Sequence, residues 1–167
     1  KIVTTNGDYP DQEGEFIGVE TEEIQSGYEP PIHDFSMERG GEDHTEKYLN
    51  TEHLVVIIAY SLSNSEKEGF IPIKEVTDKA LENGYEVIAL SASSEEVTDA
   101  LVEEYDLNFK FYFCDMTTLK TIVRSNPGIL ELQKGTIKQK LHWNDADKFV
   151  MKQVGPAKVI FDEALKV

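Results

Sequence analysis

The segment Leu54–Tyr60 is almost continuously apolar and rich in β-branched residues. Such a run is typical of a strand that is covered on both faces at the centre of a sheet, because an edge strand alternates apolar and polar residues. A second run of this kind, Tyr85–Ala92, follows a segment whose apolar residues have helical spacing, from about Glu66 to Asn83. Two buried strands joined through a helix predict a βαβ unit with parallel strands, which constrains the chain to an α/β architecture.

The remaining segments extend this unit on both sides. Further strands are expected at Ile32–Met37, Phe109–Cys114, Ile129–Gln133 and Thr136–Trp143, and further helices from a Thr45 cap to Leu49, from Ser93 to Tyr105, from Thr117 to Ser125 and from Ala146 to Val154. The order predicts a mixed sheet that is parallel at its centre and antiparallel where a hairpin closes it, with helices on both faces. This three-layer α/β sandwich resembles the thioredoxin fold.

Length and charge limit the organisation and the class of partner. The 167 residues suit one domain, or one domain with an appendage. Residues 1–27 are acidic and turn-rich, and we expect them to form a strand-and-loop appendage or linker, with the domain over residues 28–167. Sixteen Lys and Arg against 32 Asp and Glu give a net charge of −16, which repels phosphates and excludes nucleic acid as a partner.

Thioredoxin chemistry needs a thiolate at a helix N-terminus and a second thiol that resolves the mixed disulfide. The corresponding place in this chain is the segment 63–68, where the two cysteine columns fall on Ser65 and Glu68 or on Asn64 and Lys67. The chain has one cysteine, at position 114, so two-thiol chemistry within it is excluded. Ser65 is expected to act as a helix cap, because serine has too high a pKa to replace the thiol and has no adjacent histidine as base.

We therefore predict a vacant active site that binds a protein or peptide. Pro127 follows a helix and precedes a strand, where the thioredoxin fold places a cis-proline beside its active site, and an extended peptide could pair there as an added strand. The alternative is a turn needed only for folding. The predicted binding residues are Ser63, Asn64, Ser65 and Glu66 at the helix start, with Asn126 and Pro127 opposite.

Cys114 leaves two interpretations open. At the end of an aromatic strand it is expected to be a small buried hydrophobic residue. Near the helix that starts at Thr117 it could instead be a reactive thiol, provided that it is partly exposed and its pKa is lowered. The four histidines have no metal-ligand spacing, so neither a metal nor another cofactor is expected.

Several strings of residues carry a closer resemblance. They are Tyr-Glu-Pro-Pro-Ile-His-Asp-Phe-Ser at 28–36, Gly-Glu-Asp at 41–43, Leu-Lys-Thr-Ile-Val-Arg-Ser-Asn-Pro-Gly-Ile at 119–129 and Lys-Gly-Thr-Ile at 134–137. Over about residues 28–150 the chain resembles the thioredoxin-like C-terminal soluble region of DoxX-type membrane proteins of the Bacteroidetes, and it is more broadly similar to periplasmic thiol:disulfide interchange proteins and peroxiredoxins. The DoxX resemblance implies membrane anchoring through helices that precede Lys1, a periplasmic location and no known reaction.

Three functional hypotheses follow. The leading one is a non-catalytic thioredoxin-like module with a binding or accessory role in a membrane complex, for example a complex with a redox or respiratory function. The alternative is a single-cysteine, thiol-dependent reductase or peroxidase that uses Cys114, with its resolving thiol on the membrane part expected before Lys1 or on a partner. The third is a structural tail without a ligand, which predicts no pocket at the helix start.

Overall fold

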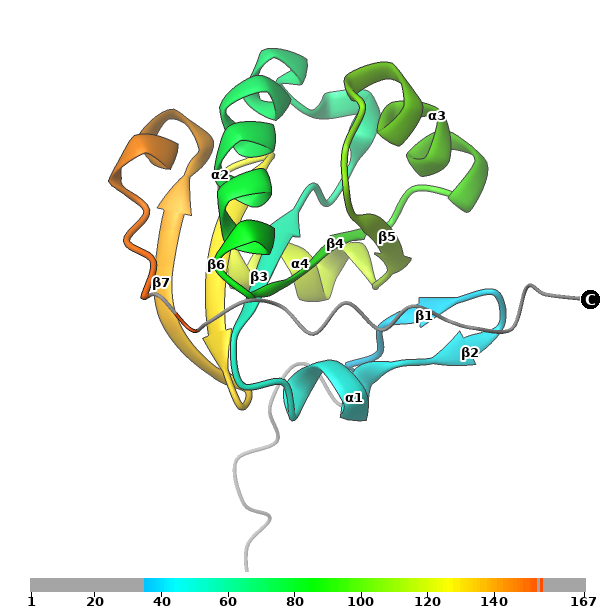
Figure 1. The fold of residues 1–167 in the computed structure, drawn as a ribbon. Helices are drawn as coiled ribbons and strands as arrows, with labels where there is room; N and C mark the ends of the chain where they lie inside the picture. The colour runs from blue at the N-terminus through cyan, green and yellow to red at the C-terminus, as the bar shows by residue number, and fades with distance from the viewer. Residues whose placement is uncertain (1–34, 153, 155–167) are drawn as a thin grey trace, which may run out of the picture. The chain divides into compact units, whose positions relative to one another are not determined.

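The structure, a computed structural model, describes residues 35–152 and 154. Its strands form one sheet in the order β2-β1-β5-β4-β3-β6-β7 (Figure 1). They are β1 (Glu38–Arg39), β2 (Glu42–Asp43), β3 (Leu54–Ile58), β4 (Glu86–Ser91), β5 (Lys110–Phe113), β6 (Gly128–Gln133) and β7 (Thr136–His142). The α-helices are α1 (Thr45–Leu49), α2 (Phe70–Glu82), α3 (Glu95–Tyr105) and α4 (Met116–Ile122).

The predicted central strand lies at the centre of the sheet. β3 pairs in parallel with β4 and antiparallel with β6, and β4 pairs in parallel with β5. Every residue of β3 is buried, as its unbroken apolar sequence predicts. The β6–β7 hairpin closes one side of the sheet antiparallel, which confirms the mixed sheet.

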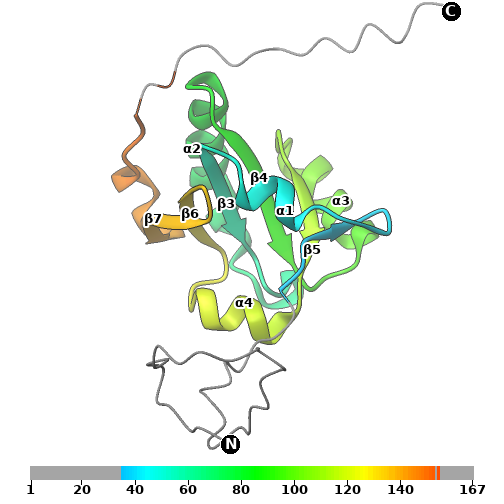
Figure 2. The same cartoon turned by 90° about the horizontal axis from the view of Figure 1, so that it is seen from below.

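Helices cover both faces of the sheet. α2 and α3 pack on one face through residues such as Phe70, Ile73 and Leu101, and α1 and α4 pack on the other through Tyr48 and Leu119. Figure 2 shows α4 on the opposite side of the sheet from α2. Alternate residues of β3 therefore enter two separate apolar clusters.

The predicted start of the helix after β3 is wrong. α2 begins at Phe70 and not near Glu66, because the backbone N–H of Glu66 donates to the carbonyl of Asn126 and both Ser65 and Glu66 have extended backbones. Short 3-10 helices at Leu62–Asn64 and Lys67–Gly69 fill the interval. The end of α2 agrees with the prediction, since Asn83 is its C-cap and Gly84 follows with a positive φ of 87°.

The helix predicted over Ala146–Val154 does not form. A 3-10 helix spans Trp143–Lys148, with non-helical dihedral angles at Asp145. After it, the side chain of Gln139 bonds both the N–H and the carbonyl of Val150, which holds this segment beside β7. These side-chain bonds take the place of the helical bonds that the prediction assumed.

The N-terminal predictions are only partly testable. Residues 1–27 and 32–34 lie outside the described residues, so the appendage and its boundary stay predictions. Within the predicted strand 32–37, the described residues 35–37 are not in a strand, and β1 begins at Glu38 instead. Thr45 is the first residue of α1 and not its cap, because its hydroxyl bonds Asp43 and accepts from the Met37 N–H. Within residues 35–152, no helix is long and apolar enough to cross a membrane.

Candidate functional site

The segment after β3 and the turn before β6 meet at Asn126. Asn126 Nδ2 donates to the carbonyl oxygen of Ser61 at 2.8 Å. The Asn126 carbonyl oxygen accepts from the N–H of Glu66 at 2.9 Å. The loop between Ser61 and Glu66 is thus held at both ends by one residue, which is itself buried.

The floor beneath this loop is tightly packed. The Asn126–Pro127 peptide bond is cis, and Pro127 is buried. A Cβ added at Gly69 would come within 2.9 Å of the Trp143 ring and 3.2 Å of Pro127 Cγ. Trp143 is therefore a core residue under the site, and its Nε1 has no hydrogen-bond partner among the described residues.

The outer side of the loop faces solvent. Ser63, Asn64 and Glu66 are exposed, and Ser65 is half-buried. Ser63 Oγ and Asn64 Nδ2 both hydrogen-bond the hydroxyl of Ser61, while Ser65 Oγ donates to the carbonyl of Leu62. Four of the predicted binding residues thus lie in this loop, three of them exposed, and Asn126 and Pro127 lie beneath it in the turn before β6.

The predicted cap role of Ser65 is wrong. Gly69 occupies the cap position of α2, and no side chain caps the helix there. The Ser65 hydroxyl donates instead to the carbonyl of Leu62, within the loop. The loop therefore lies before α2 and is separated from its first turn by the second 3-10 helix.

Ser61 is the residue that the sequence prediction missed. Its carbonyl accepts from Asn126 and its hydroxyl hydrogen-bonds both Ser63 and Asn64, so several hydrogen bonds of the loop meet at Ser61. Ser93, after β4, adds a bond from the Leu62 N–H to its hydroxyl at 3.1 Å. The positions of Ser61 and Ser93 in the sequence could have indicated the site. Both residues follow the C-terminal ends of neighbouring parallel strands, where the binding sites of α/β proteins lie.

Cys114 does not meet the requirements of a reactive thiol. It is 1 % exposed, and burial, with a smaller contribution from the charge of Asp115, raises the pKa of its thiol to about 11. A nucleophilic cysteine needs exposure and a lowered pKa. Cys114 meets neither condition in this structure, and the prediction of a small buried residue is confirmed.

Around the loop, the described residues provide neither a redox group nor a metal site. Its side chains are hydroxyls, an amide and a carboxylate, none of which is a redox group. Among residues 35–152, no three His, Cys, Asp or Glu side chains come together as a metal site. What the loop offers is a fixed, polar, solvent-facing surface.

Solved structures with a thioredoxin-like fold match this chain. The thioredoxin domain of a thiol-disulfide oxidoreductase from Bacteroides vulgatus is 15 % identical with a TM-score of 0.51, and the match covers 71 % of this chain and 93 % of that one. A thiol:disulfide interchange protein from Bacteroides sp. is 15 % identical with a TM-score of 0.52, over 70 % of this chain and 84 % of that one. A thiol-disulfide oxidoreductase from Bacteroides fragilis is 13 % identical with a TM-score of 0.52, over 68 % and 90 %. No protein-family model matches the sequence, and no curated protein is significantly similar to it.

Proposed function

We propose that this domain, which has a thioredoxin-like fold, is a non-catalytic binding module that uses the loop Ser63–Glu66 as its contact surface. The observation that carries the proposal is the pair of hydrogen bonds from Asn126 to Ser61 and from Glu66 to Asn126, which hold a loop without thiols in one conformation. A loop that is ordered before binding loses less conformational entropy when a partner docks, so its polar groups can contribute to affinity.

The partner we propose is a protein or peptide that contacts the exposed side chains of Asn64 and Glu66. Addition of a peptide strand at Asn126 itself is disfavoured, because its carbonyl already accepts from Glu66 and its side chain is buried. The resemblance to DoxX-type proteins supports a wider proposal, that the domain is membrane-anchored, faces the periplasm and has an accessory role in a membrane complex.

The binding proposal is tested by panning a library of linear peptides against the full chain. Peptides enriched on the wild-type protein should bind the Glu66→Arg variant at least about tenfold more weakly, because an exposed charge in the contact surface is reversed. Glu75→Arg is the matched control, since Glu75 is equally exposed but lies on α2. Enriched peptides that bind all three proteins alike, or a library that yields no binder, would overturn the proposal.

The non-catalytic part has its own test. With insulin and dithiothreitol as probe, the wild-type chain should not accelerate disulfide reduction above the rate without protein, because its one thiol is buried. An acceleration that Cys114→Ala removes would restore the enzyme hypothesis.

A further inference from the structure

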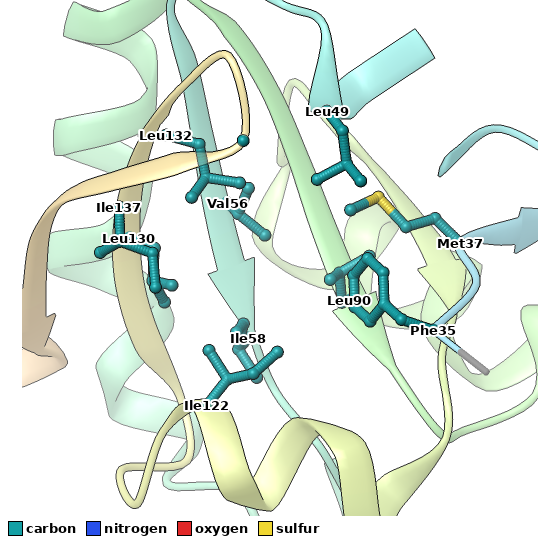
Figure 3. A pocket seen from close by; sticks show the side chains of 11 residues that line it. Phe35, Met37, Leu49, Val56, Ile58, Leu90, Ile122, Leu130, Leu132 and Ile137 are labelled. Carbon is teal, nitrogen blue, oxygen red and sulfur yellow. The ribbon is translucent and has the colours of Figure 1, made fainter. Parts of the chain in front are cut away.

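An apolar cavity of about 150 Å³ opens on the face of the sheet that α4 covers. Figure 3 shows Leu130 and Ile137 on one side, Phe35 and Leu49 on the other, and Ile122 of α4 at one end. All the side chains that line it are apolar, so an occupant finds no side-chain hydrogen bond there. A cavity of this size with such a lining accepts a benzene-sized group.

The cavity is accessible from the β7 side. Its floor residues Val56 and Ile58 are fully buried, whereas Ile137 at its rim is 51 % exposed. Leaving apolar surface of this kind in water costs free energy that an apolar occupant would recover.

A second, polar pocket of about 310 Å³ lies at the C-terminal end of α4. Arg124, Lys140 and His142 line it together with Ser125, and none of its lining residues is acidic. This composition stands out in a chain with a net charge of −16. Within residues 35–152, neither Arg124 nor Lys140 forms an ion pair.

The side chain of His142 adds a third hydrogen-bond donor beside the two cations. Its Nδ1 accepts from the Asn144 N–H at 3.1 Å, which places the ring proton of the neutral side chain on Nε2. The backbone carbonyls at the C-terminus of α4 disfavour an anion, so these side chains must supply the attraction.

The two pockets adjoin each other. Ile122 lines both of them. Leu130 of the apolar cavity and Lys140 of the cationic pocket are direct partners in the β6–β7 register, and such partners have Cβ atoms about 5 Å apart. A single small molecule can therefore span from one pocket to the other.

We propose that this face binds an amphiphile with a short alkyl or aryl group and an oxyanion head, a carboxylate or a phosphate. The apolar part fills the cavity behind Ile122, and the head meets Arg124, Lys140 and His142. Charge complementarity selects this occupant, since an oxyanion head can form charge-assisted hydrogen bonds with Arg124 and Lys140, whereas a neutral molecule or a cation cannot. The proposal does not depend on the peptide site at Ser63–Glu66.

The test is calorimetric titration of the full chain with octanoate and with octyl phosphate, whose relative affinities distinguish the two heads. Saturable binding of either is expected, and octyltrimethylammonium, with the same chain and the opposite charge, should not bind. The Arg124→Gln/Lys140→Gln variant should weaken binding at least about tenfold, as expected for lost charge-assisted contacts. Lys79→Gln/Lys152→Gln removes the same charge from two exposed lysines outside both pockets and should bind like the wild type.

A second variant addresses the apolar end. Ile137→Asp places a carboxylate at the exposed rim of the cavity and should abolish binding of both ligands while the protein stays folded. Three results would overturn the proposal: equal binding by the two double variants, equal binding of the cationic ligand, or no binding to the wild type.

Discussion

The side-chain amide of Asn126 donates a hydrogen bond to the carbonyl oxygen of Ser61 at 2.8 Å, across 65 positions of the sequence. The backbone carbonyl of the same residue accepts from Glu66, so Asn126 fixes both ends of the candidate loop. Sequence reasoning placed Asn126 in the binding surface, whereas the structure places it beneath that surface. Its first effect is therefore on the shape of the loop.

Asn126→Ala is expected to lower the free energy of unfolding by about 1–3 kcal/mol, because it leaves the carbonyl of Ser61 without its donor in a buried position. Urea unfolding followed by circular dichroism measures this loss. Asn64→Ala is the matched control, since Asn64 is an exposed amide in the same loop, and its effect should stay within about 0.5 kcal/mol. Equal stability of the two variants would show that the Asn126 amide does not hold the loop.

Cys114 should be protected from alkylation in the folded protein. Iodoacetamide reacts with thiolates, and the thiol of Cys114 is both inaccessible and, because of burial, raised in pKa to about 11. Modification followed by mass spectrometry should be slow in native conditions and fast in urea. Fast native modification would contradict the buried position.

The stability of the domain should decrease in alkaline solution. Burial raises the pKa of Cys114 from 9.0 to about 11, and burial together with the Tyr48 hydroxyl raises that of Tyr112 from 10.0 to about 12. The folded state therefore keeps protons that the unfolded chain releases, so the free energy of unfolding falls as pH rises above about 9. Between about pH 8 and about pH 10 the wild type should lose roughly 1 kcal/mol more than Cys114→Ala. Parallel pH profiles of the two proteins would refute the assignment to Cys114.

The hydroxyl of Tyr85 hydrogen-bonds both the sheet and the segment that follows the last 3-10 helix. It donates to Oε1 of the buried Glu131 at 3.2 Å and accepts from the Lys152 N–H at 3.0 Å. Tyr85→Phe should lower the free energy of unfolding by about 1.5–3 kcal/mol, because a buried carboxylate loses a donor. Tyr105→Phe removes a hydroxyl that has no hydrogen bond among the described residues and should be nearly neutral. If both variants unfold at the same urea concentration, the hydrogen bonds of Tyr85 do not stabilise the domain.

The elements that the sequence predicted correctly are those whose signal is local. The unbroken apolar run of β3 and the Asn83-Gly84 stop of α2 follow from burial and from a positive φ, and both are confirmed. The helix predicted over Thr117–Ser125 is α4 (Met116–Ile122). It begins one residue earlier because Asp115 accepts from the Thr118 N–H as the cap, and it ends at Ile122 because Val123 has an extended backbone.

The two largest errors share a non-local cause. The start of α2 is displaced by the bond from Glu66 to Asn126, and the expected helix after Asn144 is replaced by bonds from Gln139 to Val150. In neither case does the sequence of the affected segment indicate the distant contact. The same holds for the candidate site, whose loop residues were predicted but whose centre at Ser61 becomes visible only when β3 and the turn before β6 are brought together.

Gly69 provides the sharpest test of the packing beneath the candidate loop. Its φ of −64° is one that any residue adopts, so a substitution there acts through space alone. A Cβ would lie 2.9 Å from two atoms of the Trp143 ring, which must shift to make room. Gly69→Ala should therefore lower the free energy of unfolding by about 1–3 kcal/mol and change the emission of the single tryptophan. Glu68→Ala, at the exposed neighbouring position, should change neither quantity, and an unaltered spectrum in Gly69→Ala would show that Trp143 does not pack against this turn.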